Sequence, residues 1–435
     1  MPVLSLSVNV IFPLVILFGG VFFTFRLRIF PLFHPVKFLR ELKDKGGGFA
    51  SLNLALAGTL GVGNIVGVVN AIRLGGAGSV LWMCLCATLC ASLKYAEAYL
   101  ASLTKRKRED GFFGGGYVYV ERVLGRIGRI AAVAFSAFFI LSSLSTGACM
   151  QASAIAYSVS SVFSCSVGAV SLALGVVVLV SVIGGLSKIS AITNRIVPVM
   201  TAAYLLLSFA VIISRTDALP GVLSDIFFSA FRREGVIFGI GGFCFTECMK
   251  CGIMRGLLSN EAGCGSSASA QATESEGDPH RQGCLGIAEV YADTVVMCTV
   301  TALAVLSAGV DMSEKNDILL TLGIYENVGG KAFLILSALC ISVFGYATLI
   351  CFAGYGGECI RYIFGGKRSE RLFYALYLSL YIICIAASPF VSGEAVLLTA
   401  DISMGVMSLI NVPALAIAFG SCGDPWQKVK SRVRA

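Results

Sequence analysis

Charge is scarce in this chain of 435 residues: lysine, arginine, aspartate and glutamate together make up 13% of it. Soluble domains carry about 25% charged residues, so the composition excludes an ordinary soluble protein. Histidine is scarcer still, with His34 and His280 alone. A membrane-embedded transferase needs a convergent histidine, cysteine or acid pair, so two isolated histidines make this alternative the weaker one. We therefore expect no enzyme and no cofactor.

Apolar sequence is abundant, because hydrophobic residues make up 57% of the chain. Apolar runs of about 20 residues, the length that spans a bilayer, recur from end to end. They predict an all-α polytopic membrane protein with about eleven spans. The expected span centres lie near residues 15, 62, 90, 142, 176, 205, 245, 295, 345, 380 and 407.

The loops predict the orientation of the spans. Basic residues gather in alternate loops, such as 105–108, and again at the end of the chain, 428–434. The loop with Asp311, Glu314 and Asp317 is acidic. The positive-inside rule then places the N-terminus outside the cell and the C-terminus in the cytoplasm. The net charge of +8 reflects this topology in a lipid bilayer and indicates no nucleic-acid partner.

The number of spans allows an internal repeat within a single transporter domain, 1–435. The first span, 1–28, stands apart, and the ten others divide into two groups of five, 50–214 and 234–420. Because each group has an odd number of spans, the second has the opposite orientation to the first. This arrangement is the inverted repeat of many secondary transporters.

The sequence AGTLGVGN (57–64) interrupts a hydrophobic segment with three glycines. An unwound turn inside a membrane is tolerated only where it is buried in protein or lines a polar cavity, so it indicates a transporter's binding site. Thr59 and Asn64 add oxygen ligands for a small cation, and the next half-helix presents N–H groups to a carboxylate. The alternative is a glycine-rich helix crossing, where small residues allow close packing.

A second glycine-rich segment, 235–256, is expected to be the matching broken helix of the second repeat. Glu247 and Lys250 lie three residues apart there and are predicted to pair. The small polar residues of 255–282 predict a gate under the bundle on the cytoplasmic side, or else an ordinary cytoplasmic linker.

Isolated polar residues inside apolar spans are further candidates. Gln151 needs partners, either a substrate or a neighbouring helix. Thr348 could offer its hydroxyl to a cation or bond back to its own helix. Intramembrane acids are functional by default, which applies to Asp293, whereas Asp401 could face water at the interface.

The chain resembles the alanine/glycine:cation symporter family, also called sodium:alanine symporters. Four passages carry the resemblance: AGTLGVGNIVGV with LGGAGSVLWM (57–83), GGLSKISAITNRIVP (184–198), RGLLSNEAGCGS (255–266) and DTVVMCTVTAL (293–303). The resemblance implies a LeuT-type 5+5 inverted repeat with one extra N-terminal transmembrane helix. It also implies symport of sodium with a small neutral amino acid, alanine or glycine, across a prokaryotic plasma membrane.

The resemblance also implies roles for individual residues. For the substrate they are Gly61, Val62, Gly63, Asn64, Gln151, Gly241, Gly242, Phe243 and Phe352. For sodium they are Ala57, Thr59, Leu60, Asn64 and Thr348. Phe352 stands where family members often have a tryptophan that closes the pocket, which predicts room for side chains larger than alanine. Proton coupling, another amino acid, and a passive channel or sensor are the alternatives within this fold.

Overall fold

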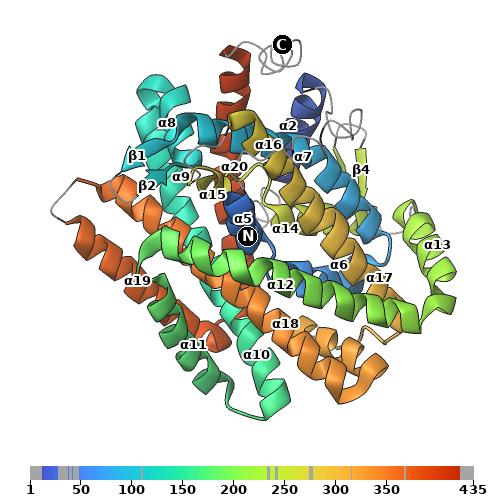
Figure 1. Cartoon of the computed structure of the whole chain (residues 1–435). Coiled ribbons are helices and arrows are strands. Elements are labelled where there is room, and N and C mark those ends of the chain that lie inside the picture. Colours follow the sequence, from blue (N-terminus) through green and yellow to red (C-terminus); the bar gives the residue numbers. More distant parts are fainter. Residues whose placement is uncertain are drawn as a thin grey trace.

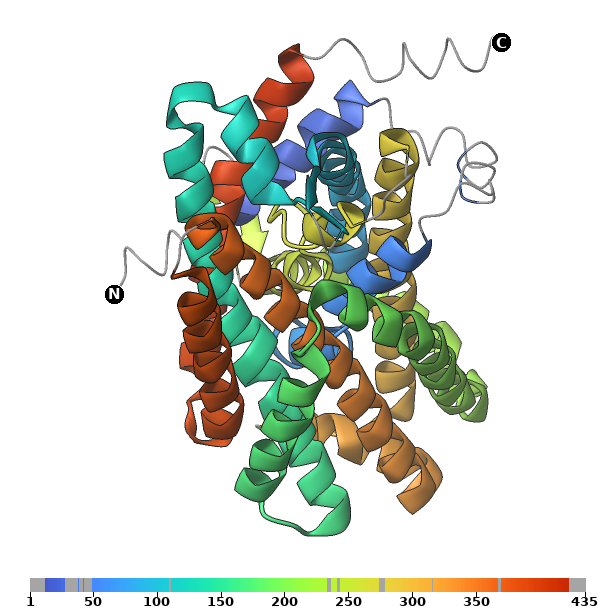
Figure 2. The ribbon, with the colours of Figure 1, turned by 60° about the vertical axis from the view of Figure 1, so that its left-hand side comes forward.

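The computed structural model describes residues 12–27, 38, 42, 49–108, 111–232, 236–240, 243–273, 278–314, 316–366 and 369–421. Most of these residues lie in helices that pack into a bundle (Figures 1 and 2). Two antiparallel ribbons accompany them, β1 (Arg106–Arg108) with β2 (Gly111–Phe113), and β3 (Val236–Ile240) with β4 (Phe243–Thr246). The predicted helical class is therefore confirmed.

The helices fall into long and short apolar stretches. In the described part of the chain, seven stretches are long and apolar enough to cross a membrane: Ser79–Thr104, Gly125–Phe163, Gly185–Ser214, Pro279–Ala308, Asp317–Phe364, Glu370–Phe390 and Gly393–Phe419. Shorter apolar helices span Phe12–Arg26, Phe49–Thr59, Val66–Gly75 and Val167–Val182. Every predicted span centre except those near residues 62 and 245 falls inside one of these stretches.

The helices of the first half are α2 (Phe12–Arg26), α5 (Phe49–Thr59), α6 (Val66–Gly75), α7 (Ser79–Thr104), α8 (Gly116–Val123), α9 (Gly128–Ser142), α10 (Gln151–Phe163), α11 (Val167–Val182), α12 (Gly185–Ser214) and α13 (Leu219–Ala230). A π-helix, η4 (Ser143–Met150), joins α9 to α10. Helix α11 exposes Leu172, Val176 and Val180 at one-turn spacing. An exposed apolar stripe of this kind fits contact with lipid.

The helices of the second half are α14 (Glu247–Asn260), α15 (Ala268–Gln271), α16 (Pro279–Val290), α17 (Thr299–Ala308), α18 (Asp317–Phe364), α19 (Glu370–Ala387) and α20 (Gly393–Ser421). A π-helix, η6 (Tyr291–Cys298), joins α16 to α17. Helix α18 bends at Gly330, whose φ of 62° lies in the left-handed region that glycine tolerates. Helices α10 and α12 both pack against α18, and α7 packs against α2, α14 and α16.

The first predicted break is confirmed. Helix α5 ends at Thr59, a single 3-10 turn follows at Val62–Asn64, and α6 begins at Val66. Gly61 lies in extended backbone between them, with a ψ of −166°. The chain therefore leaves the helical path inside the bundle, as the glycine spacing predicted.

The second predicted break is wrong in its position. Residues 236–240 and 243–246 form the ribbon β3–β4, and α14 then continues without interruption from Glu247 to Asn260. The chain leaves the helix only at Glu261, whose φ of 51° is left-handed, and becomes helical again at Ala268. The second break is therefore 261–267, and the burial of these residues argues against an ordinary cytoplasmic linker.

Close packing explains two of the glycines on which the predicted break at 235–256 is based. A Cβ on Gly252 would lie 2.3 Å from the carbonyl oxygen of Ser79, and one on Gly256 would lie 3.2 Å from Met83. Both glycines let α14 approach α7 closely, which is the usual role of small residues between membrane helices. Glycine content alone does not separate this use from an unwound turn.

Candidate substrate and cation site

A cavity of about 520 Å³ lies between the first break, α10, α14 and the beginning of α18. Its lining includes Val62, Gly63 and Val66 on one side and Arg255 and Asp317 on others. The first turn of α6 thus faces the cavity. The first N–H groups of a helix lack intrahelical acceptors, and the helix dipole favours an anion there. This end of the cavity can therefore hold a carboxylate.

Gly61, Gln151 and Thr348, three of the predicted site residues, meet next to the cavity. A Cβ on Gly61 would lie 2.9 Å from Thr348 Oγ1 and 3.1 Å from Gln151 Oε1. Gln151 Oε1 accepts a hydrogen bond from the backbone N–H of Val62 at 3.0 Å. The Thr348 hydroxyl donates to the Ala57 carbonyl at 3.0 Å. These contacts hold the unwound turn between two long helices.

Asn64 and Asp293 form a second, deeper polar group. The Asn64 side-chain amide donates to Asp293 Oδ1 at 2.6 Å and to Ser259 Oγ at 3.2 Å. The other Asp293 oxygen accepts from the Ser259 and Thr294 hydroxyls at 2.7 and 2.9 Å. Asn64 and Asp293 are both 0% exposed. The hydrogen bonds thus join the first break, α14 and η6.

Two features of this group fit a bound cation. Asn64 Oδ1 is buried and has no hydrogen-bond partner among the described residues. None of the described lysines and arginines lies within 4.0 Å of the Asp293 carboxylate. Amide, hydroxyl and carboxylate oxygens are the ligands that hard cations take in proteins. The site therefore fits a small cation such as sodium.

Three predicted residues are buried near the break but face other partners. The Thr59 hydroxyl donates to the Ala55 carbonyl of its own helix at 3.3 Å. Leu60 is buried, and its N–H closes the last turn of α5 on Leu56. Phe352 is buried in an aromatic cluster with its ring centroid 6.3 Å from that of Phe139, and it is not among the residues that line the 520 Å³ cavity.

The remaining predicted substrate residues come from the segment that the structure forms as a ribbon. Gly241 and Gly242 lie outside the described residues. Phe243 lies in β4, before α14 begins, and pairs with Ile240 of β3. Because the second break lies at 261–267, the prediction that Phe243 lies in a broken helix is wrong.

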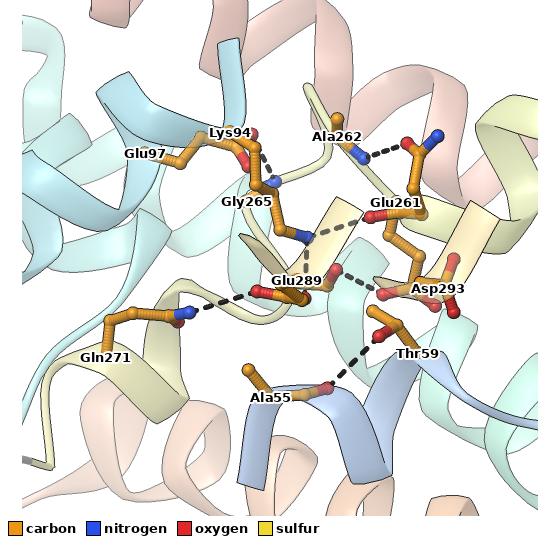
Figure 3. A network of polar contacts seen from close by, with 12 residues as sticks. Ala55, Thr59, Lys94, Glu97, Glu261, Ala262, Gly265, Gln271, Glu289 and Asp293 are labelled. Carbon is orange, nitrogen blue, oxygen red and sulfur yellow. Dashed lines mark hydrogen bonds and ion pairs between the residues drawn. The ribbon is translucent and has the colours of Figure 1, made fainter. Parts of the chain in front are cut away.

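The second break is held by charged side chains from neighbouring helices (Figure 3). Lys94 Nζ donates to the carbonyl of Asn260, the last residue of α14, at 2.8 Å. Its ammonium also lies 3.1 Å from Glu289 Oε1 of α16. A cation at a helix C-terminus compensates free carbonyls and the negative helix end. Lys94 therefore fixes the point where α14 stops.

The glycines of the second break bind α7 and α20. The N–H of Gly265 donates to Glu97 Oε1 at 2.9 Å. The Asn411 side-chain amide donates to the same Glu97 oxygen at 2.6 Å and to the Gly263 carbonyl at 2.9 Å. The backbone groups that a helix would satisfy internally thus find side-chain partners, which is the requirement for an unwound turn in a membrane.

Sequence reasoning missed several residues of this site, namely Lys94, Glu97, Ser259, Glu289 and Asn411. The first two carried a readable signal, since Lys94 and Glu97 lie in the middle of an apolar helix, where charges mark function or pairing. Ser259 carried none, because hydroxyls are common in membrane helices and usually bond back to the backbone.

Two other candidates lie apart from the breaks. Lys250 Nζ is 4.0 Å from Glu247 Oε1, so the predicted pair forms, but both side chains are more than a third exposed. Asp401 lines a small cavity of about 40 Å³ with Met254 and Met404.

Two interrupted helices that meet beside a cavity, in a bundle of apolar helices, define a secondary membrane transporter and no enzyme. The comparisons agree. The chain belongs to the sodium:alanine symporter family, whose profile matches residues 3–427.

Relatives share about 30% of their residues with this chain over most of its length. Sodium/alanine symporter AgcS of Methanococcus maripaludis is 30% identical, with 94% of this chain and 91% of that protein covered. Probable sodium/glutamine symporter GlnT of Bacillus subtilis is 32% identical, covering 91% and 83%. Amino-acid carrier protein AlsT of the same organism is 29% identical, covering 92% and 84%.

A solved structure shares the fold. A mutant manganese transporter from Eremococcus coleocola matches with a TM-score of 0.53, covering 84% of this chain and 75% of that one. Its sequence identity is 12%, so the likeness shows the fold alone.

Proposed function

We propose that the protein is a sodium-coupled symporter that carries a small neutral amino acid, alanine or glycine, into the cell by alternating access. The observation that carries the proposal is Asn64. Its backbone belongs to the unwound turn beside the cavity, and its buried side-chain oxygen has no partner among the described residues. One turn can thus serve a substrate and an ion together.

The substrate carboxylate binds at the start of α6, in the part of the cavity lined by Val62, Gly63 and Val66. The positive end of the helix supports this position. Gln151 is a positioning residue, because it holds the N–H of Val62 and so fixes the turn. Gly61 is needed for close approach, since any side chain there would press on Gln151 and Thr348.

Sodium binds between Asn64 Oδ1, the Asp293 carboxylate and the Ser259 hydroxyl. Burial of an uncompensated carboxylate is costly, and a bound cation removes that cost. A second position, the predicted one, uses the Ala57 carbonyl and the Thr348 hydroxyl, which already touch at 3.0 Å. Of the predicted ligands, Thr59 and Leu60 receive the least support from the contacts.

The two breaks also support the LeuT-type layout of ten core helices and one extra helix, α2. The first break lies in residues 50–214 and the second in residues 234–420, once in each expected repeat. The cavity lies at the end of the bundle with Asp317 and Ser388, which the loop charges place outside the cell. We infer an outward opening of the pathway, with an external N-terminus and a cytoplasmic C-terminus in a prokaryotic plasma membrane.

Reconstitution into liposomes tests the proposal. Labelled alanine should accumulate inside when sodium is high outside, and glycine should compete. Equal accumulation with potassium in place of sodium, and with no proton gradient, would exclude sodium coupling. A sodium-independent uptake that follows an imposed proton gradient would instead identify the proton-coupled alternative.

A further inference from the structure

One lysine and three glutamates are buried together where α7, the second break and α16 meet (Figure 3). Lys94 is 1%, Glu97 1%, Glu261 5% and Glu289 0% exposed. We call these four residues the Lys94 cluster. If all four are ionised, one positive charge faces three negative charges. An excess of negative charge in a membrane protein's interior is costly unless something compensates it.

Lys94 cannot compensate all three glutamates equally. Its ammonium is engaged by Glu289 at 3.1 Å and by the Asn260 carbonyl at 2.8 Å. Glu97 and Glu261 lie beyond the 4.0 Å range of an ion pair with any lysine or arginine in the described part of the chain. Neutral donors serve these two carboxylates instead, including the Ser266 hydroxyl on Glu261.

Buried acceptor atoms of the region without a hydrogen-bond donor among the described residues include two that no ammonium approaches. One is Glu97 Oε2, and the other is Oε1 of Gln271, whose amide nitrogen donates to Glu289 Oε2 at 3.0 Å. A buried carboxylate oxygen without a donor is costly, and a bonded proton removes its charge.

Among the described residues, the other titratable groups that act on the cluster are an acid, thiols and phenols. They come from α7, the break, η6, α8 and α18, and they are Cys90, Cys264, Asp293, Tyr119 and Tyr355. Asp293 is an acid, and the others are neutral thiols and phenols. The surroundings therefore strengthen the case for an added positive charge.

We propose that the Lys94 cluster binds one exchangeable proton and that this proton controls the second break. The proton bonds to Glu97 Oε2, the buried carboxylate oxygen that lacks a donor, and leaves to water when the break moves. Glu97 links the proton to the backbone, since its other oxygen holds the Gly265 N–H and the Asn411 amide. Loss of the charge on Glu97 weakens both hydrogen bonds and frees the break from α7 and α20.

This inference rests on the proposed function in one respect: the movement of the second break is a step of the transport cycle. Two measurements therefore test the proton site separately from the proposed function. The first is calorimetry of alanine binding in saturating sodium, in buffers with different ionisation enthalpies. The apparent binding enthalpy should vary linearly with the buffer's ionisation enthalpy, with a slope of up to roughly one proton per alanine. The slope should fall by at least half in Glu97→Gln, a near-isosteric change, and stay unchanged in Glu121→Gln, a half-buried control on α8 outside the cluster.

The second measurement needs no substrate. A proton bound in the folded cluster and released on unfolding makes the melting temperature fall as pH rises. Glu97→Gln should flatten this fall, and Glu289→Gln serves if the first variant folds poorly. Two results together overturn the proton site: an alanine-binding enthalpy that does not vary with the buffer, and a melting profile that is identical in the wild type and both variants. The proposed function would still stand. A sodium-dependent melting shift that the variants abolish, with no pH dependence, overturns it in favour of a sodium ion.

Discussion

The side-chain amide of Asn64 donates a 2.6 Å hydrogen bond to Asp293, although 229 residues separate the two in the sequence. Asn64 belongs to the unwound turn of the first half, and Asp293 to the π-helix η6 of the second half. π-Helical turns occur frequently at functional sites. The contact ties the two halves of the chain together at the proposed cation site.

Asp293→Asn should reduce the dependence of alanine binding on sodium. The change keeps the size of the side chain but removes the negative charge that a cation needs and replaces one acceptor oxygen with an NH2 donor. We expect sodium affinity to fall at least roughly tenfold, about 1.4 kcal/mol. Calorimetry of alanine binding over a sodium series measures this. Asp225→Asn on exposed α13 is the matched control, and equal effects of both variants would contradict the assignment.

Gly61→Ala should abolish transport by crowding. Its methyl group would lie 2.9 Å from Thr348 Oγ1 and 3.1 Å from Gln151 Oε1. Overpacking of this kind costs about 1–3 kcal/mol and displaces the turn. Gly323→Ala, where no atom lies within 4 Å, is the control and should transport normally. Liposome uptake tests both, and normal uptake by Gly61→Ala would show that the turn is not held as tightly as described.

Gln151→Ala should weaken both alanine binding and stability. The substitution leaves the buried N–H of Val62 without its acceptor, at a cost of about 1–3 kcal/mol. Gln151→Glu keeps an acceptor oxygen and should recover part of the stability. Melting in detergent and calorimetry separate the two effects. An unchanged melting temperature in Gln151→Ala would mean that Gln151 acts on the substrate alone.

Phe352→Trp tests the predicted pocket lid. Phe352 packs so closely against Gly147 that a Cβ on Gly147 would lie 2.4 Å from the Cβ of Phe352. A larger ring in this packed cluster should destabilise the protein by about 1–3 kcal/mol. Phe18→Trp, on a ring that is 68% exposed, should leave the melting temperature unchanged. A stable Phe352→Trp protein with a preference narrowed to glycine and alanine would instead restore the lid interpretation.

Cys149 offers a test of the orientation. Its side chain lines the 520 Å³ cavity, while Cys165 is exposed in the loop between α10 and α11. A membrane-impermeant thiol reagent added outside intact cells should label both cysteines, and alanine with sodium should protect Cys149 alone. Mass spectrometry of the peptides reads out the labelling, with Cys149→Ser as the control. Labelling of Cys165 only in inside-out vesicles would reverse the predicted topology.

The first break could be predicted because its signal is local: three glycines and two polar residues within eight positions of an apolar run. The second break could not be placed in this way. Its polar sequence, with Asn260, Glu261 and Ser266, looks like a cytoplasmic segment when taken alone. It is buried because Lys94, Glu97 and Asn411 satisfy it from helices that are remote in sequence. Such tertiary partners are invisible to a reading of one segment at a time.

The partners of α7 also bear on how the protein is made. Lys94 and Glu97 lie in the middle of a helix that must enter the bilayer, where a central lysine costs about 2.5–3.5 kcal/mol on insertion scales. The carbonyl that Lys94 binds belongs to a residue synthesised 166 positions later. While the ribosome makes the intervening chain, Glu97, one turn away on the same helix, is the acid nearest in sequence to the lysine. Helix α7 therefore reaches its lasting position only when the second half of the protein supplies the Asn260 carbonyl and Glu289.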